Sequence, residues 1–112
     1  MNDYKEVVIG RIVSGEKGYP VDGAVVKLYD KDLLIDDHLG TAISDKDGGF
    51  RVEFNWSDYK DGPFEERPDI FCNVTNPVSG KTTKTKVYDE LEGELNADES
   101  AEIMDLGDIQ VD

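Results

Sequence analysis

Polar and apolar residues alternate over several short stretches of the chain, as they do in strands that bury one face. The clearest alternation spans 50–55, and a second spans 24–29. Clusters of glycine, proline and asparagine separate these stretches and predict turns. The pattern therefore predicts seven strands, near 7–13, 24–29, 39–44, 50–55, 70–74, 81–88 and 103–111.

No segment has the hydrophobic period of a helix. The stretch 89–100 is acidic and low in β-propensity, and we expect a loop or one short helical turn there. Seven short strands with turns between them favour a single antiparallel β-sandwich over residues 1–112. The side chains expected in its core are those of Val26, Leu28, Phe50, Val52, Phe54 and Ile109.

The last predicted strand changes its apolar parity at Gly107. Met104 and Leu106 precede this glycine, and Ile109 and Val111 follow it. A bulge at Gly107 would keep both pairs on the core side, because one extra residue restores the alternation.

Spaced glycines, prolines and aspartates resemble those of prealbumin-like domains, a group that includes carboxypeptidase regulatory-like and transthyretin-like proteins. The likeness begins at Gly10-Arg11-Ile12-Val13 and Gly18-x-Pro20-Val21-x-Gly23-Ala24. It is closest to the transthyretin-like proteins at Asp36-Asp37-His38-Leu39-Gly40 and Ser44-Asp45-x-x-Gly48-x-Phe50. The resemblance implies a seven-stranded prealbumin-like (Ig-like) sandwich, and it implies little about activity because such domains have many roles.

The enzymes of this group depend on residues that the chain lacks. Hydroxyisourate hydrolase uses several histidines and a terminal Tyr-Arg-Gly-Ser, and intradiol dioxygenases use two tyrosines and two histidines on iron. This chain has one histidine, His38, and ends in Ile-Gln-Val-Asp. Because these histidines are missing, we expect no enzymatic activity.

Isopeptide-forming modules of similar fold join a lysine to an Asn or Asp beside a buried acid. The candidates for such a bond would be Lys5, Asp108 and Glu53.

The composition is strongly acidic, with 26 acidic and 12 basic residues and a net charge of −14. This charge argues against nucleic acid or an anionic membrane surface as a partner, since both would repel it. No apolar run is long enough to span a bilayer, so we expect no membrane insertion. One cysteine and the absence of a signal-peptide pattern favour the cytoplasm by default, with an exported parent protein left open.

The acidic residues concentrate in alternate loops. Loops 30–38, 55–69 and 88–102 hold 16 acidic and three basic residues, a net charge of −13. Alternate loops of an antiparallel sandwich share one end, so this end should carry nearly all the net charge. Aspartate oxygens on flexible loops are ligands that Ca²⁺ prefers. The sequence thus predicts a calcium site at this end, with a solvated acidic loop as the alternative. Its candidate ligands are Asp30, Asp32, Asp36, Asp37, Asp58, Asp61 and Asp69.

The remaining polar and aromatic residues are expected to be structural. Asp45-x-Asp47-Gly48 predicts a hairpin turn. Cys72 is expected to be buried in a strand. Lys84 and Lys86 alternate with threonines, as charges that guard a strand edge against pairing do. Trp56, Tyr59 and Phe64 should cap the core, with an exposed binding patch as the alternative.

These observations favour a non-enzymatic binding or interaction module, with calcium as a candidate ion. The expected partner is an unidentified protein or ligand, and the acidic surface would suit a basic one. Two alternatives stay open: an enzyme of the transthyretin-like group with an unrecognised site, and a purely structural module of a larger assembly.

Overall fold

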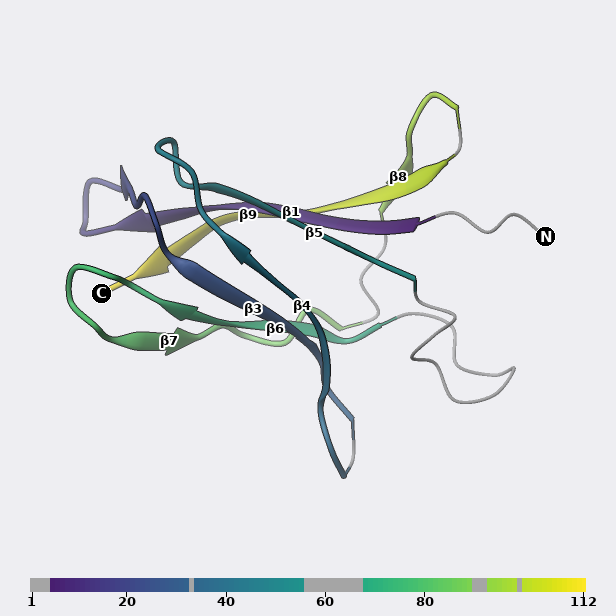
Figure 1. The fold of residues 1–112 in the computed structure, drawn as a ribbon, viewed down its shortest axis with the longest axis horizontal. Coiled ribbons are helices and arrows are strands. Elements are labelled where there is room, and N and C mark those ends of the chain that lie inside the picture. The colour runs from purple at the N-terminus through teal and green to yellow at the C-terminus, as the bar shows by residue number, and fades with distance from the viewer. Residues whose placement is uncertain (1–4, 33, 56–67, 90–92, 99) are drawn as a thin grey trace.

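Two β-sheets pack face to face in the computed structural model, which describes residues 5–32, 34–55, 68–89, 93–98 and 100–112 (Figure 1). Sheet A contains β1 (Lys5–Ser14), β2 (Tyr19–Pro20), β5 (Gly49–Phe54), β8 (Glu94–Leu95) and β9 (Ala101–Val111). Sheet B contains β3 (Val25–Asp30), β4 (Asp37–Ile43), β6 (Ile70–Thr75) and β7 (Thr82–Lys84). The described residues form no helix, and the predicted all-β sandwich is confirmed.

The strand order is β5-β1-β9-β8 in sheet A and β4-β3-β6-β7 in sheet B. The short strand β2 also pairs with β1, on the same side of β1 as β5. Every pair is antiparallel except β1 and β9, which pair in parallel from Lys5↔Ala101 to Ser14↔Val111. The parallel pair follows from parity, because the first and seventh predicted strands run in the same direction. The described residues form nine strands where the sequence predicts seven. The additional strands, β2 and β8, have two residues each, and β8 lies where a loop or helical turn was expected.

The core lies between the sheets and contains side chains from both. All six predicted core residues are buried. Ile12, Ile70, Val74 and Met104 join them with no exposed surface. Cys72 is likewise buried in β6, as predicted. The alternation in the sequence therefore identifies the buried faces of β3 and β5.

Two glycines of sheet A have structural roles that another residue would not fill. Gly107 has a φ of 71°, and the register of β1 on β9 shifts there, from Ile9↔Asp105 to Arg11↔Asp108. This confirms the predicted bulge, which keeps the apolar residues on both sides of Gly107 in the core. At Gly10, a Cβ atom would lie 2.7 Å from Cε1 of Phe50, so only a glycine leaves room for that ring.

Alternate connections lie at opposite ends of the sandwich, as the parity argument predicts (Figure 1). The turns 15–18, 45–48 and 76–80 lie at the end where Ser14 and Val111 are paired. Residues 31–32, 34–36 and 96–98 lie at the other end, but Figure 1 places the first two groups and the last on opposite sides of the molecule. The described parts of loops 30–38 and 88–102 thus share an end without meeting. The described residues include no helix that could cross a bilayer.

Candidate interaction surfaces

Four of the predicted calcium ligands lie around the β3–β4 hairpin. Asp30 is buried at the end of β3, and it pairs in register with Asp37 on β4. The backbone N–H of Asp32 donates to Oδ1 of Asp36, at 3.1 Å, and this bond closes the hairpin. The structure therefore gathers these four acids in one segment.

Asp69 joins the same region from the start of β6. Its backbone N–H donates to Oδ1 of Asp30 at 3.0 Å, and its carbonyl accepts from the N–H of Lys31 at 2.8 Å. The remaining candidates, Asp58 and Asp61, lie outside the described residues, as do Trp56, Tyr59 and Phe64. Within the described ranges, no three His, Cys, Asp or Glu side chains converge closely enough to hold a metal ion. Calcium binding therefore stays a prediction.

The tip of this hairpin exposes apolar side chains. We define the hairpin tip as residues 32 and 34–37. Leu34 is 94% exposed and Ile35 is 77% exposed, and Asp32 and Asp36 flank them. Figure 1 shows the hairpin projecting from sheet B, away from the rest of the molecule. This exposed tip was not predicted from the sequence, although Leu34-Ile35 inside an acidic loop was the available signal.

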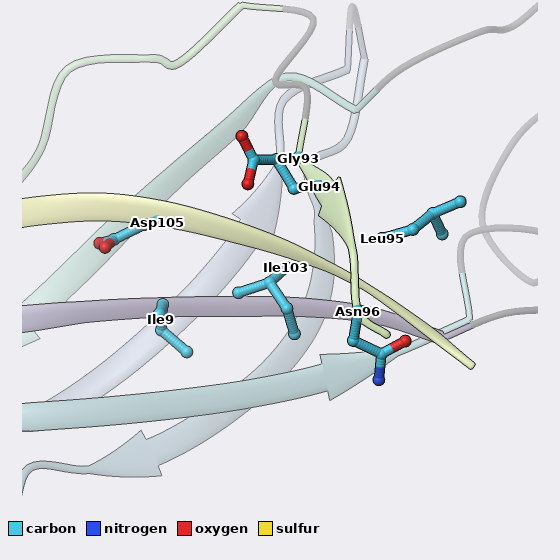
Figure 2. A pocket seen from close by; sticks show the side chains of 7 residues that line it. All are labelled: Ile9, Gly93, Glu94, Leu95, Asn96, Ile103 and Asp105. Atoms are coloured by element: carbon cyan, nitrogen blue, oxygen red, sulfur yellow. The ribbon is translucent and has the colours of Figure 1, made fainter. Parts of the chain in front are cut away.

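An open hollow lies on the outer face of sheet A (Figure 2). It has a volume of about 770 Å³, with Ile9 and Ile103 as its apolar floor. Glu94 and Asp105 contribute carboxylates to its rim. Gly93 approaches the floor closely, because a Cβ there would lie 2.4 Å from the carbonyl oxygen of Ile103. A small ligand could contact both apolar and acidic groups in this hollow.

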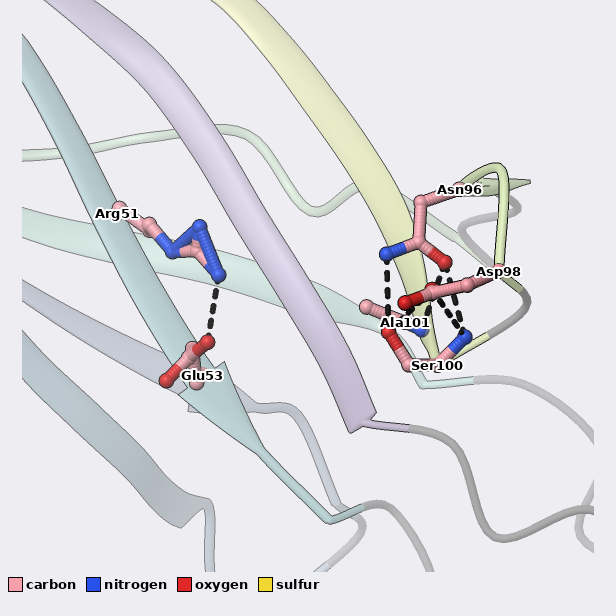
Figure 3. A network of polar contacts seen from close by, with 6 residues as sticks. All are labelled: Arg51, Glu53, Asn96, Asp98, Ser100 and Ala101. Atoms are coloured by element: carbon pink, nitrogen blue, oxygen red, sulfur yellow. Dashed lines mark hydrogen bonds and ion pairs between the residues drawn. The ribbon is translucent and has the colours of Figure 1, made fainter.

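Ion pairs flank the hollow on the same face. The guanidinium of Arg51 pairs with the carboxylate of Glu53 on β5 (Figure 3), and Arg11 pairs with Asp108 at 3.5 Å. The isopeptide candidates lie far apart. Lys5 is the register partner of Ala101, at the opposite end of β1 from Arg11 and Asp108. Lys5 and Asp108 are thus separated by about 20 Å of strand, and the structure does not bring the isopeptide candidates together.

The outer face of sheet B carries a row of aromatic and cationic side chains. His38, Tyr29 and Phe71 are neighbours in register across β4, β3 and β6, with ring centroids 5.3 and 5.2 Å apart. The ammonium of Lys84 lies 4.6 Å from the centroid of the Phe71 ring. At the edge of the sheet, the ammonium of Lys86 lies 5.0 Å from the centroid of the Tyr88 ring, which itself packs against the core. His38 also contacts Thr41, with 2.9 Å between Nε2 and Oγ1. This face is cationic in an acidic molecule.

Two shifted pKa values have clear structural causes. Burial raises the pKa of the Cys72 thiol to about 12, so this thiol is a core group and not a nucleophile at neutral pH. Hydrogen bonds from Ser100 lower the pKa of Asp98. In Figure 3, Asn96 and Asp98 both accept from the N–H of Ser100, which closes the turn before β9.

The turn after β4 has the predicted structural role. Oδ1 of Asp45 accepts from the backbone N–H groups of Asp47 and Gly49, each at 2.9 Å. Gly48 has a φ of 83°, a conformation that glycine adopts without strain. These bonds occupy the carboxylate of Asp45 in an Asx turn.

The comparisons with known proteins concern the fold. No protein-family model matches the chain, and no curated protein matches it either. It is similar to the dioxygenase domain of a dioxygenase and carbohydrate-binding protein fusion from Streptomyces sp. SirexAA-E. That match has 13% identity and a TM-score of 0.59, and it covers 99% of this chain and 81% of that chain.

Two larger proteins contain a similar domain. Chlorocatechol 1,2-dioxygenase from Pseudomonas putida matches with 13% identity and a TM-score of 0.59, over 99% of this chain and 62% of that chain. A 9R-lipoxygenase from Cyanothece PCC8801 matches with 18% identity and a TM-score of 0.56, over 96% of this chain. The chain spans only 16% of the lipoxygenase. At these identities the likeness shows a shared β-sandwich fold and nothing about activity.

Proposed function

We propose that this domain is a non-enzymatic interaction module that docks on a partner through the hairpin tip. One observation carries the proposal: Leu34 and Ile35 are almost fully exposed between Asp32 and Asp36. Burying such a side chain in a partner would contribute about 1.5–3 kcal/mol, an amount that the isolated domain does not gain. The hydrogen bond from Asp32 to Asp36 holds the tip in shape before binding, which lowers the entropy cost of docking.

The charges around the tip indicate the kind of partner. Asp32 precedes the two exposed apolar residues in the sequence, and Asp36 and Asp37 follow them. An apolar cleft rimmed by lysine or arginine would complement this arrangement, and the acids would steer such a partner toward the tip. The proposed partner is therefore a basic protein surface with an apolar centre.

The proposal includes a prealbumin-like form of the sandwich. The turn at Asp45 and the glycine at position 10 support it, since each belongs to the resemblance seen in the sequence. The shared fold with dioxygenase domains is consistent with this assignment. An enzyme remains the alternative, and the hollow over Ile9 and Ile103 is where its substrate would bind. One strong hit in a metabolite panel would favour it.

Calcium binding at the same hairpin is a second candidate. The observation that favours it is the contact between Asp69 and Asp30, which brings two predicted ligand loops together. Residues 56–67 lie between β5 and β6 in the sequence and contain two further candidates, Asp58 and Asp61. A bound ion would neutralise part of the acidic charge there.

The docking proposal can be tested with synthetic peptides and NMR spectroscopy. A twelve-residue amphipathic peptide of leucine and lysine serves as the probe, and a lysine and serine peptide of equal charge serves as the control. We expect the first peptide to shift the amide signals of residues 34–37 and the second to leave them unchanged. Leu34→Ser with Ile35→Ser should abolish these shifts. Val78→Ser removes an apolar side chain that is 91% exposed at the opposite end, and it should bind as the parent does. Equal shifts with both peptides, or equal losses in both variants, would overturn the proposal.

A further inference from the structure

The strands of sheet B differ in charge from the rest of the chain. Residues 70–88 contain three lysines and no acidic residue, while the whole chain carries −14. On β3 and β4, the only acids are Asp30 and Asp37, at the hairpin end. Lys27 and Lys84 lie on the outer face of sheet B, and both are register partners of Asn73 on the strand between them. The outer face of sheet B therefore attracts anions locally.

One edge of sheet B is formed by β7, and residues 85–88 continue beside β6 beyond it. Within the described residues, β7 pairs with β6 and with no other strand (Figure 1). The segment beyond β7 also follows β6, because the N–H of Thr85 donates to the carbonyl of Cys72 and that of Tyr88 to the carbonyl of Ile70. β7 presents the backbone groups of its three residues on the side away from β6. Beyond it the ladder is irregular, because the N–H of Cys72 donates to the hydroxyl of Thr85, and this hydroxyl donates to the carbonyl of Lys86.

The lysines of this edge lie over aromatic rings. Lys84 contacts the Phe71 ring and Lys86 the Tyr88 ring, through cation–π interactions. These contacts fix the two ammonium groups on the sheet, where they would flank an added strand. Lys84 ends β7, and Lys86 lies two residues beyond it. Alternate side chains of an extended peptide are roughly 7 Å apart, so two of them could face these two lysines.

We infer that this edge binds an extended acidic peptide with carboxylates on alternate residues, which adds a strand beside β7. Backbone hydrogen bonds would provide affinity, as in other cases of strand addition, and the alternate carboxylates would face Lys84 and Lys86. A second copy of the chain fits poorly, because two such edges would place lysines opposite lysines. The net charge of −14 opposes any anion at long range. At physiological salt this repulsion is screened beyond about 8 Å, so the local lysines decide binding.

The probe is a fluorescent eight-residue peptide of alternating glutamate and threonine, measured by anisotropy at physiological salt. A peptide of the same composition, with four glutamates followed by four threonines, tests the requirement for alternation. We expect the alternating peptide to bind more tightly. Binding should also slow amide hydrogen exchange at the edge, since the new strand protects those N–H groups.

Charge variants locate the site. Lys84→Glu with Lys86→Glu should weaken binding at least about tenfold, through lost attraction and new repulsion. Lys17→Glu with Lys46→Glu changes the net charge equally at exposed lysines in other loops, and it should change the affinity less than about twofold. Lys84→Gln with Lys86→Gln gives the same test with a gentler change, and circular dichroism checks the fold of each variant.

Three results would overturn the inference: equal losses in the two Glu variants, equal binding of the two peptides, or binding of a heparin oligosaccharide without binding of the peptide. The last result would assign the face to a polysaccharide. The variant Leu34→Ser with Ile35→Ser should bind the acidic peptide as the parent does. The experiments can therefore disprove docking at the hairpin tip and peptide binding at β7 independently of each other.

Discussion

The hydroxyl of Ser44 donates a hydrogen bond to the backbone carbonyl of Val21, with 2.6 Å between the two oxygens. The same hydroxyl accepts from the N–H of Ala24 at 2.8 Å, and Ser44 is buried. Ser44→Ala would leave both backbone groups without this partner, and we expect it to lower the free energy of unfolding by about 1–3 kcal/mol. Urea denaturation measures the change. Ser79→Ala removes an exposed hydroxyl that donates to Asp112 and should cost less than about 0.5 kcal/mol. Equal losses would mean that the buried bonds contribute nothing.

Phe50 is a second point at which stability can be measured. Its side chain is buried in the core, on the strand with the clearest alternation in the sequence. Phe50→Ala should lower the free energy of unfolding by about 3–5 kcal/mol, because it leaves a cavity as well as losing apolar burial. An unchanged denaturation midpoint would mean that the ring lies outside the core.

Gly10 and Phe50 should show coupled effects. Gly10→Ala would place a methyl group against the Phe50 ring, and we expect a loss of about 1–3 kcal/mol from overpacking. Phe50→Leu in the same chain should reduce the cost of Gly10→Ala, because the smaller side chain leaves room for the methyl group. A double-mutant cycle measures this coupling. Strict additivity would contradict the contact.

The thiol of Cys72 should be inert in the folded protein. Its folded pKa is raised to about 12 by burial, from an ordinary value of 9.0. The associated stability is fully present below pH 9 and is lost as the pH rises toward 12, because the unfolded state releases the proton first. Alkylation at pH 8 should therefore proceed only as the protein unfolds, and urea should accelerate it. Rapid modification without denaturant would contradict the burial of Cys72.

Calcium is tested by thermal unfolding. If the hairpin binds Ca²⁺, millimolar Ca²⁺ should raise the melting temperature more than NaCl of equal ionic strength, because a bound ion stabilises the native state by mass action. At 100 times the dissociation constant this effect is about 2.7 kcal/mol. Mg²⁺ should do less, since it demands stricter geometry.

Paired variants complete the calcium test. Asp30→Asn with Asp32→Asn should abolish the calcium-specific part. Asp22→Asn with Asp47→Asn, which changes the charge equally at exposed residues elsewhere, should preserve it. Equal rises in melting temperature with Ca²⁺, Mg²⁺ and NaCl would mean that the hairpin binds no ion specifically and is only a solvated acidic surface.

Local patterns predict local features of this fold well. The alternation at Phe50, Val52 and Phe54 identifies a buried face, because side-chain direction in a strand depends only on parity. The parity change across Gly107 predicts a bulge for the same reason. By contrast, β8 has two residues and is held by β9, so its own sequence contains no strand pattern.

The candidate site was less predictable, because exposure depends on distant partners. Asp30 was predicted as a ligand on a loop but is buried at the end of β3, where its carboxylate accepts from the backbone N–H of Asp69. Leu34 and Ile35 are of the residue types that usually enter the core, and only the projection of their hairpin leaves them in solvent.

The parallel pairing of β1 with β9 has a mechanical consequence. Lys5 begins one strand and Val111 ends its neighbour, so these two residues lie at opposite ends of the same ladder. Opposed forces applied at Lys5 and Val111 would act along the strands and load the bonds from Lys5↔Ala101 to Ser14↔Val111 together. In a hairpin pulled apart from its open end, the bonds would instead break one after another. If its two ends were tethered and pulled apart, this sandwich would therefore resist the force by shear between β1 and β9. The time for which the domain stays folded under that force would depend on its rate of unfolding.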